Sequence, residues 1–291
     1  MLCKLCPHQC NATRTESENI GGVCKMPFLP TIARVAPHFW EEPSISGKNG
    51  SGTIFFSGCS LHCVFCQNEE ISTKNKGKTI LVSELSDIFK KLESQGVHNI
   101  NLVTPTHFVD SIISALDIYK PNIPIVYNSS GYECVETLMR LQGYIDIYLM
   151  DFKYIDSKKS KLYSNVSNYP AVCTAALVEA YRQQSECVIK DGIMQKGLIV
   201  RHLLMPQATC DAMLIFDWVR QNTPNAFFSI MSQYVPISKA LDMPVINRKI
   251  TQREYDKVTD YILSSGFENC YIQERSSADK DYIPDFNFVG L

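Results

Sequence analysis

Strand-like and helix-like segments alternate through most of this 291-residue chain. Short apolar runs predict strands at 53–56, 99–103, 124–127, 145–150, 198–204 and 226–231, with a last short piece at 270–273. Helical periodicity predicts helices at 83–95, 109–119, 134–141, 171–187, 211–221 and 252–264. Six successive strand–helix pairs predict an α/β fold with a parallel sheet covered by helices. This pattern leaves a (β/α) barrel and a doubly wound open sheet as competing topologies.

Three cysteines follow the first expected strand as Cys59-x3-Cys63-x2-Cys66. A structural zinc site needs four ligands, so this loop alone does not complete one. Three thiolates can instead hold a [4Fe-4S] cluster by three of its irons and leave the fourth iron open. The alternative is a set of buried thiols in a core loop. Ser60 and Gln67 make the loop too polar for that alternative, so we expect a cluster.

A second group of cysteines opens the chain as Cys3-x2-Cys6-x3-Cys10-x13-Cys24. Residues 1–27 form a segment too short to bury a core, so a metal is expected to hold it together. The four thiols could bind zinc or a second iron–sulfur cluster, and His8 is an alternative ligand. A cysteine-rich tail without metal is the other interpretation.

The remaining organisation follows from prolines, charge and cysteine content. Residues 28–50 contain several prolines and are expected to be an irregular linker, and residues 51–291 to form the barrel with a C-terminal extension. The net charge of −2 does not indicate a nucleic-acid partner. We expect no membrane span, because no run of 18 apolar residues occurs. With no secretion signal at the start, twelve cysteines favour metal binding in a reducing cytoplasm.

Polar side chains lie at or near the ends of the expected strands. They are Thr104, Thr106, Asn128, Ser130, Asp151, Lys153, Arg201 and His202. In a barrel these side chains would face the cysteine loop, because the carboxyl ends of the strands meet at one face. A charged group in a buried strand such as Arg201 needs an anion. An ordinary turn at 128–131 and a surface ion pair between Asp151 and Lys153 are the simpler interpretations.

The cysteine spacing, with Phe65 just before the last cysteine, resembles the signature of the radical S-adenosylmethionine (SAM) enzymes. The resemblance implies a partial (β/α)6 barrel, which favours the barrel over the open sheet. Together with the N-terminal cysteines, residues 38–43, 66–68, 104–107 and 266–274 look similar to a branch near the pyruvate formate-lyase activating enzyme. That likeness covers nearly the whole chain.

The resemblance also implies a catalytic role for Cys59, Cys63 and Cys66. They would hold a [4Fe-4S] cluster that cleaves SAM to a 5′-deoxyadenosyl radical, with reduced flavodoxin or ferredoxin as the electron donor. The family's usual Gly-Gly-Glu element is absent here, so the hydroxyls of Thr104 and Thr106 would bind the amino group. The ribose would meet Asn128 and Ser130, Asp151 and Lys153 would lie close to the cofactor, and Arg201, beside His202, would meet the carboxylate.

Three functions compete at this stage. The first is activation of a glycyl radical enzyme, which the whole-chain resemblance favours. The second is radical modification of another substrate, namely a protein, a peptide side chain or a small molecule. The third is a non-catalytic iron–sulfur electron carrier. Polar residues at several strand ends argue against the third, because a carrier needs no cofactor pocket.

Overall fold

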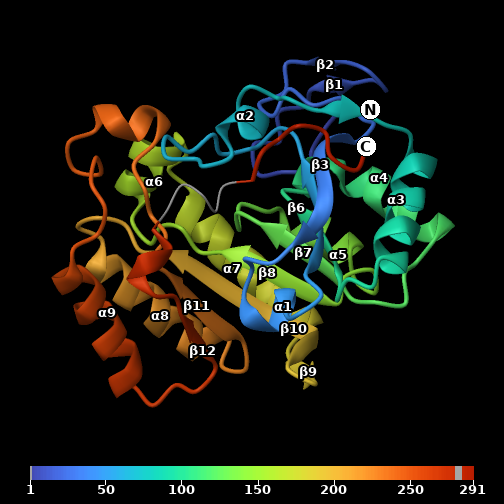
Figure 1. Cartoon of the computed structure of the whole chain (residues 1–291). Coiled ribbons are helices and arrows are strands. Elements are labelled where there is room, and N and C mark those ends of the chain that lie inside the picture. Colours follow the sequence, from blue (N-terminus) through green and yellow to red (C-terminus); the bar gives the residue numbers. More distant parts are fainter. Residues whose placement is uncertain (1, 279–283) are drawn as a thin grey trace.

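The strands form a curved, open barrel in the computed structural model, which describes residues 2–278 and 284–291 (Figure 1). The parallel strands are β4 (Ser51–Phe56), β6 (Ile100–Val103), β7 (Ile125–Ser129), β8 (Ile147–Asp151), β10 (Ile193–Leu203), β11 (Phe227–Met231) and β12 (Cys270–Ile272). Each pairs in parallel with the next in chain order. A doubly wound sheet reverses its strand order at a switch point, and this sheet does not. The expected partial barrel is therefore confirmed.

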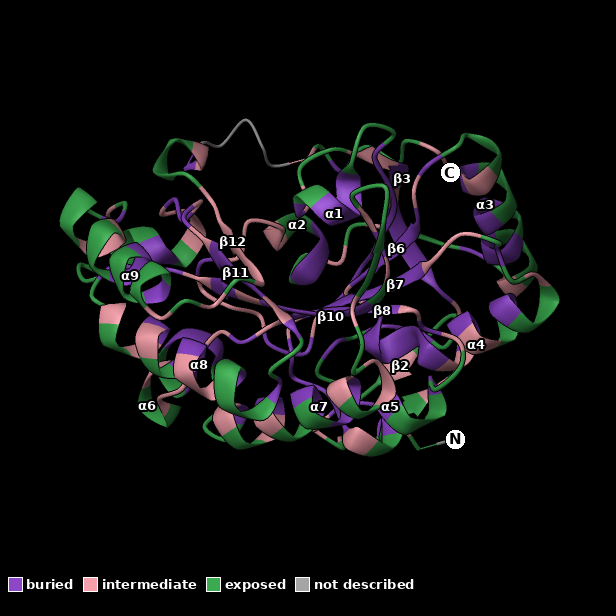
Figure 2. Cartoon of the chain, turned by 90° about the horizontal axis from the view of Figure 1, so that it is seen from below, coloured by how far each residue is buried: buried purple, intermediate pink, exposed green. Residues whose placement is uncertain are grey.

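The helices after the strands pack on the outside of the barrel. They are α3 (Val82–Ser94), α4 (Val109–Ile118), α5 (Val135–Arg140), α7 (Tyr169–Gln183), α8 (Thr209–Asn222) and α9 (Gln252–Ser264). In α3, Leu85, Phe89 and Leu92 recur at helical spacing and are buried. Figure 2 shows the same division for the whole layer: buried strands in the middle, and helices whose outer faces are exposed.

Residues 28–50 are not an irregular linker, and that prediction is wrong. They contain β3 (Thr31–His38), which pairs antiparallel with β4, and the short helix α1 (Pro43–Ser46). Apolar residues of β3 are buried against the barrel, which outweighs the prolines. Pro37 is tolerated because β5 (Lys78–Thr79) pairs only with Thr31 and Ile32, at the other end of β3.

Helix α1 closes the barrel at the amino ends of the strands. Ile45 of α1 is fully buried in a cluster with Val126, Ile147, Leu149 and Ile199, which belong to β7, β8 and β10. Side chains alternate between the two faces of a strand, so Arg201 lies on the same face of β10 as Ile199. The loop before α1, with Glu41 and Glu42, is thereby placed near Arg201.

The two ends of the chain pack on the barrel. The N-terminal hairpin of β1 (Thr13–Arg14) and β2 (Asn19–Ile20) leads to Met26, which is buried in the main core. At the other end, the Phe288 N–H donates to the Ala33 carbonyl at 3.1 Å, and the Val35 N–H donates to the Val289 carbonyl at 2.8 Å. The C-terminal segment 284–291 therefore extends along the outer edge of β3.

Several short elements were not expected from the sequence. They are α2 (Glu69–Ser72), α6 (Ser157–Ser164), β9 (Val188–Lys190), η1 (Thr106–Phe108), η2 (Ser238–Asp242) and η3 (Arg275–Ser277). β9 pairs antiparallel with the start of β10, so the helix expected at 171–187 ends earlier, at Gln183. In the described part of the chain, we find no helix of the length and apolar character that a membrane crossing requires.

Candidate functional site

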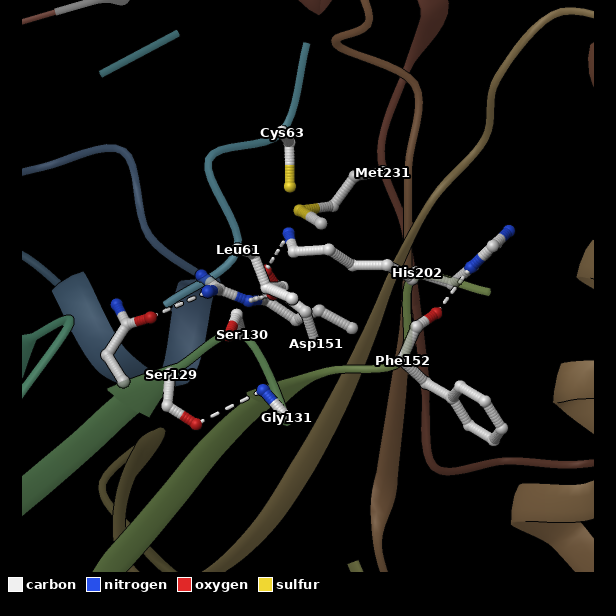
Figure 3. A network of polar contacts seen from close by, with 12 residues as sticks. Leu61, Cys63, Ser129, Ser130, Gly131, Asp151, Phe152, His202 and Met231 are labelled. Carbon is white, nitrogen blue, oxygen red and sulfur yellow. Dashed lines mark hydrogen bonds and ion pairs between the residues drawn. The ribbon is translucent and has the colours of Figure 1, made fainter. Parts of the chain in front are cut away.

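The cysteine loop lies over a cavity at the carboxyl ends of the parallel strands. The cavity has a volume of about 350 Å³, and Cys59, Cys63 and Cys66 all contribute to its lining. Asp151 and Lys153, which follow β8, lie on the opposing wall. In Figure 3 the side chain of Cys63 points toward Asp151. The three thiols and the strand-end charges therefore share one chamber.

Each of the three sulfurs accepts at least one hydrogen bond from the chain. The Leu61 N–H donates to Cys59 Sγ at 3.3 Å. The Ser72 hydroxyl donates to Cys66 Sγ at 3.3 Å, and the Ser164 hydroxyl to Cys63 Sγ at 3.0 Å. Donors of this kind stabilise a thiolate and tune a cluster that it ligates.

The loop thiols are costly to ionise without a metal. Burial raises the pKa of Cys59 to about 12, and the neighbouring thiols of Cys63 and Cys66 add to the rise. Burial also raises the pKa of Cys66, again with a contribution from Cys63. Metal binding requires thiolates and releases protons, so a cation at this place would remove the cost. The donor set therefore fits a metal cluster.

A buried ion network forms the floor of the cavity around Arg201. Its Nε donates to Asp151 at 2.8 Å, one terminal nitrogen pairs with Glu41 at 3.0 Å, and the other donates to Asn128 Oδ1 at 2.6 Å. The anion that Arg201 needs is thus supplied by the chain itself. Three internal acceptors take three of the five N–H donors of the guanidinium, and the expected contact of Arg201 with a cofactor carboxylate stays a prediction.

Lys153 completes this network on the side of the cysteines. Its Nζ lies 2.6 Å from the second oxygen of Asp151. Burial opposes the charged ammonium, but Asp151 and then Cys63 outweigh it and raise the pKa of Lys153. An ammonium has three donors, and one of them faces Asp151. Lys153 therefore stays charged in the cavity and keeps donors for a ligand.

The pKa values of two acids beside Arg201 shift in opposite directions. Burial would raise the pKa of Asp151, but Arg201 and Lys153 together lower it, so this carboxylate is ionised. Burial raises the pKa of Glu42 despite the proximity of Arg201, and its Oε2 has no hydrogen-bond partner in the described chain. The surroundings thus disfavour the ionised form of Glu42, in contrast to that of Asp151.

Thr104, Asn128 and Ser130 also line the cavity, as expected. Thr104 has a left-handed backbone with φ of 59°, and its N–H donates to the Asn128 carbonyl at 2.8 Å. The Ser130 carbonyl accepts a bond from the Tyr169 hydroxyl at 2.8 Å. These contacts fix the loops after β6 and β7 and bring the three residues to one rim.

Thr106 does not line the cavity, unlike Thr104, the other cofactor ligand expected in the loop after β6. It is buried in η1, and its hydroxyl donates to Glu133 Oε1 at 2.6 Å. Glu133 also accepts a bond from the Tyr127 hydroxyl at 3.1 Å and is 1% exposed. Burial raises the pKa of Glu133 to about 7, although Thr106 and Tyr127 oppose the rise. Thr106 therefore acts as a hydrogen-bond donor to this buried acid.

Glu133 gives a testable dependence of stability on pH. Its folded-state pKa of about 7 exceeds the ordinary value of 4.5, so its contribution is present below pH 4.5 and is lost as the pH rises to 7. We expect wild-type stability, measured by urea unfolding, to fall by up to about 1.4 kcal/mol per pH unit in this window relative to Glu133→Gln. Parallel curves for the two proteins would contradict the assignment.

His202 faces away from the cavity that holds the cysteines. Its Nδ1–H donates to the Phe152 carbonyl at 2.7 Å, and the ring extends away from Asp151 (Figure 3). It lines a separate cavity of about 80 Å³ beside α8. Adjacent residues of a strand point to opposite faces, so His202 and Arg201 cannot serve the same site. His107, in η1, is buried, and its Nε2 lies 2.6 Å from the Ser57 carbonyl.

Three residues of the site were missed by the sequence. Glu41 was assigned to a linker, although a buried arginine in an apolar strand signals that some acid must reach it. Ser72 and Ser164 donate to cysteine sulfurs. The two serines lie on α2 and α6, short helices that carried no clear pattern.

Comparison with known proteins bears on the same residues. The family model of the Radical SAM superfamily matches residues 53–191, which include the cysteine loop, Asp151 and Lys153. An uncharacterized protein of Methanocaldococcus jannaschii is 34% identical over 268 residues, which are 89% of this chain and 73% of that protein. Among solved structures, methylornithine synthase is similar with a TM-score of 0.49 and 14% identity, over 76% of this chain and 70% of that one.

Proposed function

Because the chain belongs to the radical SAM superfamily, we propose that it uses SAM to remove a hydrogen atom from a polypeptide substrate. Membership in the family implies an enzyme that cleaves SAM reductively with an iron–sulfur cluster. The observation that carries the proposal is the shared chamber, with three hydrogen-bonded thiols on one wall and the pair of Lys153 and Asp151 on the other.

Cys59, Cys63 and Cys66 are the ligands we assign to the [4Fe-4S] cluster. When bound, the cluster supplies the electron that splits the S–C5′ bond of SAM into methionine and a 5′-deoxyadenosyl radical. The chain supplies position and surroundings. The hydrogen bonds from Leu61, Ser72 and Ser164 stabilise the thiolates, and the surrounding walls limit the access of water to the chamber.

We assign the methionine end of SAM to Lys153 and Asp151. The guanidinium of Arg201 donates from all three of its nitrogens to side chains of this protein. Lys153 has spare donors and lies near the cysteines, so it is the cation that suits the carboxylate. Asp151 is an ionised acceptor for the amino group. Arg201 then acts as a positioning residue that holds Asp151.

We expect Lys153→Met to weaken SAM binding about 10- to 100-fold, which is the value of one or two charged hydrogen bonds. The iron content should stay at the wild-type level, because Lys153 is not a ligand. Equilibrium dialysis of reconstituted protein against labelled SAM measures the affinity. Lys159→Met is the matched control, because Lys159 pairs with Asp211 beside the smaller cavity. Equal SAM affinity in the two variants would contradict the role of Lys153.

The size of the cavity supports a polypeptide substrate. A volume of about 350 Å³ is near the lower limit of sites for one small molecule, which run from roughly 300 to 1,000 Å³. SAM and the cluster would occupy most of it. A second small molecule would have little room, whereas one protruding side chain or backbone position of a larger partner could enter from the mouth.

The activity itself is tested without knowing the substrate. Protein purified and reconstituted without oxygen, then reduced with dithionite, should convert SAM to 5′-deoxyadenosine, measured by mass spectrometry. An intact cluster that yields no nucleoside would instead support the electron carrier.

The class of substrate is tested by isotope transfer. A deuterated cell extract is divided into macromolecular and small-molecule fractions, and each is incubated with the enzyme and unlabelled SAM. Deuterium in 5′-deoxyadenosine from the macromolecular fraction supports the proposal. Deuterium only from the small-molecule fraction would show that a metabolite is the substrate.

The resemblance to the pyruvate formate-lyase activating enzyme supports one particular reaction, the formation of a glycyl radical on a partner enzyme. A glycyl doublet in the electron paramagnetic resonance spectrum of a candidate partner tests it. Reduced flavodoxin or ferredoxin as donor and a cytoplasmic location belong to the same proposal. The described cysteines are all free thiols, which is compatible with a reducing compartment.

A further inference from the structure

The four N-terminal cysteines gather in one place outside the catalytic cavity. They lie in a segment that folds back on itself: the Cys3 N–H donates to the Ala12 carbonyl at 3.0 Å, and the Gln9 N–H to the Cys6 carbonyl at 2.9 Å. Arg14 links the two halves, because it contacts Cys3 Sγ at 3.7 Å and the Met26 carbonyl at 3.0 Å. Met26 stands two residues after Cys24, so the fourth cysteine joins the other three.

The four thiols are unpaired and partly shielded from solvent. Cys6 and Cys24 are buried, and Cys3 and Cys10 are half-buried. None of the four forms a disulfide. Close, unpaired thiols of this kind are the ligand set of a metal centre rather than of a packed core.

The backbone around these thiols is strained. Gln9, Asn11 and Lys25 all have left-handed backbones, with φ between 41° and 57°, and each is next to Cys10 or Cys24. Such residues cost about 1–3 kcal/mol each and persist only where other contacts fix them. The segment has little core of its own: its buried apolar residues apart from cysteine are Leu5, Ala12, Met26 and Pro27. Metal–thiolate bonds would offset this strain.

The spacing of the sulfurs indicates what kind of metal centre this is. Within residues 2–278 and 284–291, no three His, Cys, Asp or Glu side chains are placed to hold a single metal ion, and this includes the three loop cysteines. Four thiolates on one zinc ion would lie about 3.8 Å apart, given Zn–S bonds of about 2.3 Å. In a cubane each thiolate binds a different iron, so the sulfurs are farther apart. An arrangement that does not fit a single metal ion is compatible with a cluster in both places.

The segment also packs directly on the catalytic loop. His8 Nε2 lies 2.7 Å from the Ser60 carbonyl, and His62 Nε2 lies 3.2 Å from the Val23 carbonyl. A Cβ at Gly58 would come within 3.0 Å of the Cys24 carbonyl, so the two segments touch beside Cys59. His8 is engaged with the catalytic loop, and the four thiols complete a ligand set without it.

We infer that Cys3, Cys6, Cys10 and Cys24 hold a second iron–sulfur cluster, fully ligated by cysteine and seated against the catalytic loop. With four thiolates this cluster has no open iron, so it does not bind SAM. Arg14, beside Cys3, offsets part of the negative charge of a four-thiolate cluster. The inference does not rest on the proposed hydrogen abstraction, because it concerns a different set of ligands.

The test removes the ligands of the catalytic cluster and measures the iron and sulfide that the protein still holds. In Cys59→Ala/Cys63→Ala/Cys66→Ala, purified and reconstituted without oxygen, we expect iron and sulfide to fall from about eight to about four per chain. The electron paramagnetic resonance spectrum of the reduced variant should not change when SAM is added. A variant with zinc in place of iron, or with neither metal, would overturn the inference.

A second pair of proteins keeps the test decisive if the triple variant does not fold. Wild type should contain about eight irons per chain, and Cys6→Ser/Cys24→Ser about four, whereas a wild type with about four would overturn the inference. Cys210→Ser is the matched control, because that thiol is exposed on α8. Failure of the proposed function would appear separately, as a missing 5′-deoxyadenosine product in a wild type with a full complement of iron.

Discussion

Cys63→Ala is expected to lower the formation of 5′-deoxyadenosine at least about 1,000-fold, which corresponds to about 4 kcal/mol in the barrier. The variant loses one of the three thiolates of the loop, and Ser164 loses the sulfur to which it donates at 3.0 Å. Two thiolates from one loop cannot hold a cubane with a single open iron. The measurement is nucleoside production per chain after reconstitution, together with iron content and the spectrum of the reduced protein.

The control for this prediction is Cys210→Ala, which removes an exposed thiol of α8 and should retain full activity and full iron. Iron in Cys63→Ala should fall by the content of one cluster. If Cys63→Ala cleaved SAM at the wild-type rate with its cluster intact, the assignment of this cysteine as a ligand would be wrong. The open corner of the cluster would then have to lie elsewhere.

Local sequence patterns were sufficient to predict the strands and helices of the barrel. They were insufficient to predict the ion network around Arg201 that forms the floor of the cavity. The apolar runs at 99–103 and 145–150 contain β6 and most of β8, whose residues are buried apart from Asp151. The sequential pairing of the strands follows from short right-handed crossovers. β3 and α1 were not predicted from the sequence. Prolines weaken the sequence signal of a strand, and the pairing partner of β3 is supplied by the rest of the fold. Glu41 reaches Arg201 across 160 positions of sequence, and no local pattern contains such a contact.

The polar residues at the strand ends were predicted at the correct end of the barrel, but not always on the correct face of the strand. Arg201 and His202 are neighbours in sequence, yet one faces the cavity and the other faces α8. A side-chain period of two makes this difference certain for any adjacent pair in a strand, and only the burial pattern of the whole sheet decides which residue points inward. Thr104 and Thr106 differ for another reason, because η1 turns the chain away after Pro105.

Arg201→Met is expected to lower the free energy of unfolding by about 3–5 kcal/mol, the usual cost of breaking a buried ion pair by removing one partner. The Arg201 side chain is 12% exposed and lies between Asp151 and Glu41, which are similarly buried. Without the guanidinium, these two carboxylates face each other across the floor of the cavity with Lys153 as the remaining cation. The measurement is the urea-unfolding midpoint of anaerobic protein at pH 7.

A double variant separates charge from packing in this prediction. Adding Glu41→Gln to Arg201→Met removes one of the stranded carboxylates and should restore part of the lost stability, whereas a purely steric loss would not recover. Arg140→Met is the matched control, because Arg140 pairs with Asp110 at the surface, where the two side chains are 48% and 29% exposed, and it should change stability little. An Arg201→Met protein as stable as wild type would show that the network is not held by this arginine. Lys153 would then be the partner that keeps Asp151 ionised.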